Sequence, residues 1–238
     1  MLSSTQSYSP ARRQKLVKGI IFDAYGTLID TGDGSLQAVN EILSKNKSGI
    51  DAKLFYQKWK GHHKKHMDSL NTFIKEEDIF LMDLTALYQE YEIAGNPEND
   101  VKIMLNTLGK RIAYPETNLV LDALRPKYQL FIGSTSDHAP LMHDIRRNGI
   151  RVNQVFTSEY LKVYKPQKKF YQLILDEIKM QPEEVVFVGD SLADDISGPA
   201  SLGIKTIWIN RKNLAYDPTE FRPLYQIQTL SQLLDIVI

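Results

Sequence analysis

Short apolar runs alternate with helix-like segments along much of the chain. The first run, Ile20, Ile21 and Phe22, stops abruptly at Asp23. Continuous apolar runs of this length, bounded by turn residues, are typical of buried strands. We expect further strands at residues 128–132, 155–156, 185–188 and 204–209, and intervening helices at residues 114–126, 139–148, 168–178 and 192–202. The alternation predicts an α/β protein, with a parallel sheet and helices on both of its faces.

Residues 35–110 interrupt this alternation. They show little strand-like patterning, and apolar residues such as Leu36, Val39 and Leu43 recur at helical spacing. We expect a helical insertion of roughly four helices, the last near residues 99–108. The predicted domains are therefore a core of residues 18–32 and 111–238 and an inserted helical domain of residues 33–110. Residues 1–17 lack periodicity, which predicts a flexible tail.

Composition excludes some chemistry and leaves other questions open. Lys plus Arg number 29, as do Asp plus Glu, so the formal net charge is zero. A balanced chain gives no global argument for binding nucleic acid or an anionic membrane, and we expect neither partner. The absence of cysteine excludes disulfides and cysteine nucleophiles. Neither a signal peptide nor a run of ~18 apolar residues is evident, so a soluble cytoplasmic protein is the default expectation.

Polar residues follow three of the expected strands. Asp23 follows the first, Ser134 ends the second, and Asp190 follows the third. The carboxyl ends of parallel strands meet at one edge of an open sheet. Asp23 could cap a turn there, or it could act as a nucleophile. Carboxylates gathered at one crevice repel one another unless a cation lies between them, and an oxygen-rich pocket suits Mg²⁺.

The polar segments resemble, in order, the four motifs of the haloacid dehalogenase-like hydrolase superfamily. They are Asp23-Ala-Tyr-Gly-Thr27, Ser134, Lys165-Pro166 and Gly189-Asp-Ser-Leu-Ala-Asp-Asp195. The resemblance implies a Rossmann-like parallel sheet core with a helical cap inserted after the first strand. In that superfamily the cap closes on the substrate and determines what is accepted. The implied activity is hydrolysis with Asp23 as the nucleophile.

The resemblance also implies a role for each matching residue. Asp23, Asp190 and the backbone carbonyl of Tyr25 would bind Mg²⁺, and Asp195 matches the second acid of the metal site better than Asp194. Lys165 would neutralise charge on the nucleophile and the substrate. Ser134 and Thr27 would each donate a hydrogen bond to a substrate oxygen, although both could instead cap their turns.

Tyr25 is the main departure from the phosphatases of this superfamily. They usually carry a second Asp at this position as a general acid and base, and Tyr, with a reference pKa near ~10, is a poor substitute. The first motif instead resembles the metal-free L-2-haloacid dehalogenases, as do Tyr171 and Trp208-Ile-Asn-Arg211. The chain differs from those enzymes at Asp190, Leu192 and Thr135. It also has Lys60 where their cap supplies an Arg. Tyr25, Thr135, Lys60 and Tyr171 are therefore the candidate substrate-binding residues.

The balance of these features favours Mg²⁺-dependent hydrolysis of a small phosphorylated metabolite with a good leaving group. The metal-site acids alter the electrostatics of the whole pocket, whereas a missing acid is tolerable when the leaving group needs no proton. The alternatives are a metal-independent 2-haloacid dehalogenase and, more remotely, a non-catalytic binding protein. All three would bind a small anionic molecule; the sequence gives no indication of the oligomeric state.

Two further segments lie near the expected site. Residues 58–66 form a basic run in the expected cap, which could attract an anionic substrate but is more typical of a solvated helix face. Asp137 and His138 directly follow the second strand. We expect Asp137 to cap the helix that His138 begins.

Overall fold

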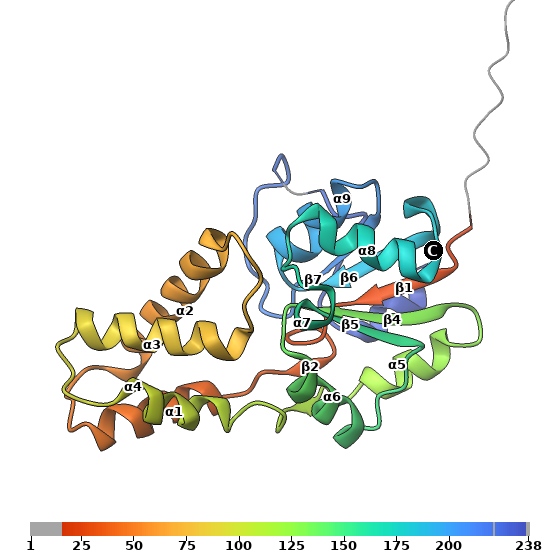
Figure 1. Cartoon of the computed structure of the whole chain (residues 1–238). Helices are drawn as coiled ribbons and strands as arrows, with labels where there is room; N and C mark the ends of the chain where they lie inside the picture. Colours follow the sequence, from red (N-terminus) through yellow and green to blue (C-terminus); the bar gives the residue numbers. More distant parts are fainter. Residues whose placement is uncertain (1–15, 221, 237–238) are drawn as a thin grey trace, which may run out of the picture.

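A six-stranded parallel sheet forms the core of the computed structural model, which describes residues 16–220 and 222–236 (Figure 1). The strand order is β5-β4-β1-β6-β7-β8. The strands are β1 (Gly19–Phe22), β4 (Gln129–Ser134), β5 (Gln154–Thr157), β6 (Val185–Gly189), β7 (Lys205–Ile209) and β8 (Tyr225–Ile227). The central position of β1 puts its carboxyl end between those of β4 and β6, which is where ligands bind in open α/β sheets.

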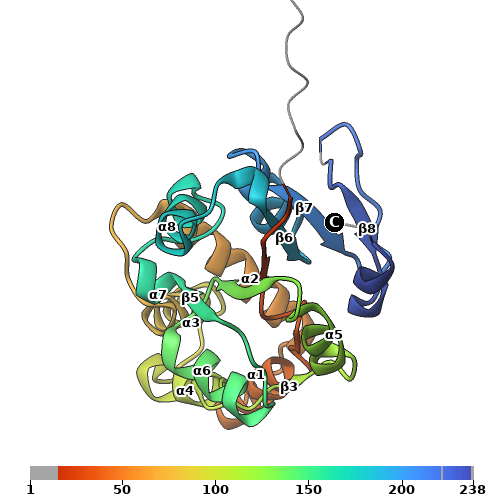
Figure 2. The ribbon, with the colours of Figure 1, turned by 90° about the vertical axis from the view of Figure 1, so that its right-hand side faces the viewer.

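Helices cover both faces of this sheet, as Figure 2 shows for α5 and α8. Side chains alternate along β1, so that Ile20 and Phe22 join one apolar cluster and Ile21 joins the other. The helical elements of the core are α5 (Thr117–Leu124), α6 (His138–Arg147), α7 (Ser158–Leu161), α8 (Lys168–Ile178), α9 (Gly198–Ala200), the 3₁₀ helices η1 (Pro182–Glu184) and η3 (Leu230–Asp235), and the π-helical turn η2 (Leu192–Ser197). Burial on both faces explains why the central strands read as continuous apolar runs.

Four helices form a cap inserted after β1, and they lie to one side of the sheet (Figure 1). They are α1 (Gly34–Lys45), α2 (Ala52–Ser69), α3 (Glu76–Glu90) and α4 (Pro97–Leu105). A third apolar cluster, separate from the two beside the sheet, fills the space between them. The two crossings between core and cap pair as a short antiparallel ribbon of β2 (Ile29–Asp30) and β3 (Ile112–Ala113).

The α/β class and the helical cap after the first strand are confirmed. Details differ: α5 begins at Thr117 rather than at Tyr114, and the ribbon and β8 were not expected. Residues 1–15 of the predicted tail lie outside the described residues, whereas Val17 is buried in the core. The exact domain boundaries stay a prediction. Among the described helices, none combines the length and apolarity needed to cross a membrane.

Candidate active site

The carboxyl ends of β1 and β6 place three carboxylates around Lys165. Its Nζ lies 2.8 Å from Asp23 Oδ1 and 2.7 Å from Asp195 Oδ1, and all three side chains are buried. Burial opposes the charge of Lys165, but the charges of Asp195 and Asp23 outweigh it and raise the pKa of Lys165. Lys165 is therefore a permanent cation bound to the predicted nucleophile.

Asp190 completes a cluster in which one oxygen each from Asp23, Asp190 and Asp195 lie within 4.8 Å of one another. Asp190 is exposed as a residue, but its carboxylate faces the crowded crevice. Lost hydration there, together with the charge of Asp23, raises the pKa of Asp190 to about 7. Burial also raises the pKa of Asp195, against the opposing charge of Lys165. Lys165 contacts two of the three carboxylates, so the cluster carries more negative than positive charge.

These residues fit a divalent cation. Asp23 Oδ2 is buried and has no hydrogen-bond partner among the described residues, so one oxygen of the predicted nucleophile is free within the cluster. Hard cations such as Mg²⁺ take carboxylate oxygens as ligands. Asp23, Asp190 and Asp195 are the residues that could hold such an ion, and its charge would offset their mutual repulsion.

The backbone around the cluster is fixed by close packing and by long-range hydrogen bonds. Gly26 has a φ of +91°, and a Cβ atom there would lie 2.3 Å from Asp190 Oδ2, so only glycine fits this turn. The indole of Trp208 donates to the Asp190 carbonyl at 2.9 Å. Arg211 donates to the Thr27 carbonyl at 2.8 Å and to Glu116 Oε1 at 2.7 Å. The residues of the Trp208-Ile-Asn-Arg211 segment therefore position the first and fourth motifs.

Tyr25 turns its hydroxyl away from the nucleophile. The hydroxyl donates to Asp144 Oδ2 at 2.8 Å, and the guanidinium of Arg111 lies 4.3 Å from the centre of the ring. Burial and the adjacent Asp144 carboxylate raise the pKa of Tyr25 further above its usual value. The phenol therefore keeps its proton near neutral pH and donates it in a hydrogen bond to Asp144, so it is not available to a leaving group.

The hydroxyl residues of the first two motifs, Thr27 and Ser134, are buried. Thr27 is fully buried, and its Oγ1 has no hydrogen-bond partner in the part of the chain that the structure describes. Ser134 accepts a hydrogen bond from Ser136 at 3.2 Å, and Thr135 Oγ1 is also buried without a partner. A small pocket joins Asp23, Asp190 and Lys165 to Ser134 and Thr135. The structure thus brings these predicted residues together, except that Thr27 does not line this pocket.

A cavity of about 620 Å³ between the cap and the core opens onto the same crevice. It shares Thr135, Lys165 and Asp194 with the small pocket. Lys60 lines it, with its Nζ 5.1 Å from the centre of the Tyr56 ring. Tyr171 lines neither space; it is buried, and its hydroxyl donates to the Asp194 carbonyl.

Three cavity-lining residues were not anticipated from the sequence: Glu76, Arg111 and, within the basic run, His63. All three come from the cap or from its return to the core. Helical spacing identifies which face of a helix is apolar, but not what that face meets across a domain boundary. The sequence offered one weak signal for His63: this polar residue comes four positions after Trp59, an aromatic residue that is buried.

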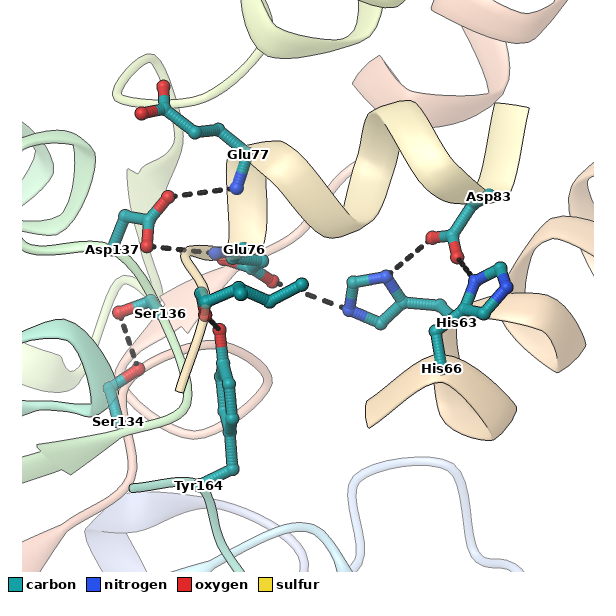
Figure 3. Close-up of polar contacts among 10 residues, drawn as sticks. His63, His66, Glu76, Glu77, Asp83, Ser134, Ser136, Asp137 and Tyr164 are labelled. Carbon is teal, nitrogen blue, oxygen red and sulfur yellow. Dashed lines mark hydrogen bonds and ion pairs between the residues drawn. The ribbon is translucent and has the colours of Figure 1, made fainter. Parts of the chain in front are cut away.

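Asp137 caps a helix of the cap instead of its own helix, α6. Its carboxylate accepts from the backbone N–H of Glu76 at 3.0 Å and of Glu77 at 2.9 Å, at the start of α3 (Figure 3). The N–H of His138 is bound by Glu159 Oε2 at 2.8 Å. The prediction for Asp137 was therefore wrong in its target, because a neighbouring domain supplied free N–H groups that local sequence does not show.

The fold and the site define a class: a capped α/β protein with a carboxylate crevice at the carboxyl edge of its sheet. The chain belongs to the haloacid dehalogenase-like hydrolase family, whose sequence profile matches residues 17–203. It is therefore a hydrolase, as its motifs indicated.

Individual relatives of the chain act on different kinds of substrate. The (S)-2-haloacid dehalogenase 1 of Pseudomonas sp. (strain CBS-3) is 26% identical over 222 residues, which cover 91% of this chain and 95% of that protein. The pyrimidine 5′-nucleotidase PynA of Streptococcus pneumoniae is 40% identical, but over 84 residues, or 35% of each chain. The hydrolase YfnB of Bacillus subtilis, solved with bound magnesium, has a TM-score of 0.79 at 19% identity, covering 93% of this chain and 98% of that one.

Proposed function

We propose that the chain hydrolyses small 2-haloacids through an ester on Asp23. The observation that carries this proposal is the Tyr25 hydroxyl, which is committed to Asp144 at 2.8 Å. No proton donor stands two residues after the nucleophile, and a halide leaves without a proton. One relative matched along almost its whole length is a 2-haloacid dehalogenase. That match reverses the order favoured by the sequence alone, which placed phosphoryl hydrolysis first.

The chemistry needs only side chains of the crevice. Asp23 Oδ2, free of hydrogen bonds, attacks C2 of the substrate, and the carbon–halogen bond breaks with its electrons leaving on the halide. Lys165 and Arg111 supply positive charge for the substrate carboxylate and the halide. Water then attacks the Asp23 carbonyl carbon of the ester, the acyl–oxygen bond breaks, and a 2-hydroxy acid leaves. One water proton goes to the departing alkoxide and the other is released to solvent, and the regenerated Asp23 carboxylate starts the next cycle.

A second candidate is Mg²⁺-dependent phosphoryl hydrolysis, favoured by the cluster of Asp23, Asp190 and Asp195 within 4.8 Å. These carboxylates would hold the ion, with the Tyr25 backbone carbonyl as a further ligand. A bound Mg²⁺ would supply charge neutralisation for a phosphoryl group. A relative with this fold, YfnB, is described as bound to magnesium. The carboxylate of Asp190 would repel a haloacid, and it is the residue that separates the two candidates.

One set of assays tests both candidates. Chloride release from L-2-chloropropionate is measured with a chelator present, and acetyl phosphate hydrolysis with and without Mg²⁺. Asp23→Asn is the blank in both assays. We expect chelator-resistant chloride release in the wild type and none in Asp23→Asn. Acetyl phosphate turnover that requires Mg²⁺, without chloride release, would replace the first candidate with the second.

Asp190→Asn gives opposite results for the two substrates. Removing one negative charge from the crevice should raise kcat/KM for 2-chloropropionate by about tenfold, the effect of about 1.4 kcal/mol of charge repulsion. The same change should abolish Mg²⁺-dependent phosphate release, because the cluster loses a ligand. Asp176→Asn, an exposed acid on α8, is the matched control and should change neither.

A further inference from the structure

Asp83, His63 and Glu76 form a chain of polar contacts in the cap (Figure 3), and His63 and Glu76 line the large cavity. Asp83 is fully buried and binds His63 Nδ1 at 2.7 Å and His66 Nδ1 at 2.6 Å. A buried carboxylate only accepts, so the Nδ1 proton of His63 points at Asp83. The other ring nitrogen, Nε2, then faces Glu76 Oε1 at 3.8 Å. The order along the chain is Asp83, His63, Glu76, with Glu76 nearest the core.

Glu76 is held at the cavity wall from two domains. It is the first residue of α3, and its N–H is bound by Asp137, three residues after Ser134. Its side chain is 19% exposed and lines the same cavity as Thr135 and Lys165. The cap helix is therefore anchored on the loop that carries the second motif, and the Glu76 carboxyl faces the space above the crevice.

The groups around Glu76 allow it to exchange a proton near neutral pH. The charged and titratable groups around it are His63 from α2, Asp137 from the β4–α6 loop, Arg111 from the return to the core, Tyr25 from the turn after β1 and Tyr164 from the segment that carries Lys165. Burial raises the pKa of Glu76 to about 7, with Asp137 adding to the rise and His63 and Arg111 opposing it. Burial would lower the pKa of His63, but the bond to Asp83 and the charge of Glu76 raise it. A general acid works best with a pKa near the working pH.

Tyr25 leaves the crevice without a proton donor beside the nucleophile, as shown above. That absence restricts the second candidate function to phosphates whose leaving group needs no proton. Glu76 lines the cavity into which the leaving group of a substrate bound at Lys165 would extend. The Glu76 carboxyl is therefore placed to donate the leaving-group proton that Tyr25 cannot supply.

We propose that Glu76, backed by His63 and Asp83, donates the leaving-group proton from the cap, which extends the activity to alkyl phosphomonoesters. This inference rests on the second candidate function, phosphoryl transfer to Asp23. Asp23 Oδ2 attacks phosphorus, the P–O bond to the alkyl group breaks, and its electrons and the Glu76 proton form the alcohol. In the second half-reaction water attacks phosphorus of the aspartyl phosphate, its proton passes to Glu76, and phosphate leaves as the Asp23 carboxylate is restored.

The experiment compares Glu76→Gln with Glu77→Gln in the full chain with Mg²⁺. Glu77 lies in the same helical turn and is also bound to Asp137 through its N–H, but its side chain is 50% exposed and does not line the cavity. The substrates are glycerol phosphate, whose alkoxide needs a proton, and acetyl phosphate, whose acetate does not. The readout is kcat/KM across pH, because it reports the first, leaving-group step.

We expect Glu76→Gln to lower kcat/KM for glycerol phosphate by about 10²–10⁴-fold, the usual contribution of a general acid. Acetyl phosphate should stay close to wild type, and Glu77→Gln should match wild type on both. The decline of wild-type glycerol phosphate hydrolysis at high pH should vanish in Glu76→Gln, and Glu76→Asp should recover part of the rate.

Other outcomes separate the possible failures. Equal losses on both substrates would make Glu76 a structural residue and overturn the inference. If the wild type hydrolyses acetyl phosphate but not glycerol phosphate, the inference about Glu76 is also overturned, whereas the proposal of phosphoryl transfer to Asp23 stands. If neither phosphate is hydrolysed but chloride is released from 2-chloropropionate, the second candidate and this inference fail together and the haloacid proposal stands.

Discussion

At the scale of single residues, the charge balance around Lys165 decides what the crevice can bind. One ammonium lies within 2.8 Å of two carboxylates, and Asp190 adds a third that has no such close cation. An incoming anion therefore needs the charge of Lys165 and of a further cation. Arg111, stacked on Tyr25 at 4.3 Å, can serve the carboxylate of a haloacid, whereas a metal ion would serve a phosphoryl group.

Glu76 also gives a stability prediction that is independent of any substrate. Its pKa is raised from 4.5 to about 7 in the folded chain, so the native state holds more protons across that interval and stability falls as pH rises through it. Glutamine does not ionise, so the Glu76→Gln variant does not lose stability in this way as pH rises. We expect the variant to be about 1–2 kcal/mol more stable than wild type at pH ~8 and equal to it at pH ~5, allowing for partial solvent screening.

Urea unfolding at both pH values, followed by circular dichroism, measures this difference. Glu77→Gln is the control, because Glu77 lies in the same helical turn and its side chain is 50% exposed. A variant that is less stable than wild type at both pH values would show instead that Glu76 is held by favourable contacts, and the raised pKa would then be wrong.

The sequence predicted the site residues that follow strands. It missed the residues that face these from the other side of the cavity. Asp23, Ser134 and Asp190 were found because strand ends in a parallel sheet converge whatever the rest of the chain does. Glu76 comes from the insertion and Arg111 from its return to the core, and their approach depends on how two domains dock, which no local pattern encodes. Tyr25 was recognised as a departure, but its partner Asp144 is 119 residues away in sequence.

At the scale of elements, the start of α3 is the main link between cap and core. Asp137 binds two N–H groups there, Tyr164 donates to the Ile74 carbonyl at 2.9 Å, and Lys75 pairs with Glu159 at 3.0 Å. Phe73 stacks on Tyr164, the residue before Lys165, with ring centres 5.2 Å apart. Residues 73–77 thus contact both the loop after Ser134 and the segment that carries Lys165.

Asp137→Ala should loosen this link. The helix start loses a carboxylate that satisfies two N–H groups, which costs about 1 kcal/mol for a typical cap. We expect faster hydrogen exchange at Glu76 and Glu77 and a higher KM for whichever substrate is turned over. Hydrogen exchange with mass spectrometry on peptides covering residues 73–80 measures the first effect, and steady-state kinetics the second.

Asp51→Ala is the matched control for Asp137→Ala. Asp51 caps α2 by accepting from Leu54 N–H at 2.9 Å, entirely within the cap. Its loss should weaken a cap helix by a similar amount without changing KM. If both variants raise KM equally, general loosening of the cap is responsible, and the anchoring of α3 on the core has no special effect.

At the scale of the whole molecule, the chain builds separate apolar clusters for the cap and the sheet. Periodicity predicted both: continuous runs gave the central strands, and helical spacing gave the insertion. The short peripheral strands were harder to predict from the sequence. β8 is three residues long with two exposed positions, and the β2–β3 ribbon has two residues in each strand, so neither carries enough pattern to be recognised.

Separate clusters predict that the cap can open or unfold without the sheet. Leu84 is fully buried in the cap cluster, and Leu130 is fully buried in a core cluster. Replacing either with Ala removes about 2–5 kcal/mol of local stability. The apolar clusters of the cap and the sheet are separate, so few apolar contacts would carry the lost stability from the cap to the sheet. Leu84→Ala should therefore speed hydrogen exchange in residues 34–105 and leave β1, β4 and β6 protected from exchange.

Leu130→Ala tests the same idea from the other side. The sheet carries Asp23 and both crossings to the cap. Destabilising the sheet with Leu130→Ala should therefore speed hydrogen exchange throughout the described chain, including the cap. Peptide-resolved hydrogen exchange under native conditions distinguishes the two patterns. If Leu84→Ala exposed the sheet strands as fully as Leu130→Ala, cap and core would be one cooperative unit. The cap could not then move independently to admit substrate, and access to Asp23 would depend on smaller motions of the segments around residues 73–77.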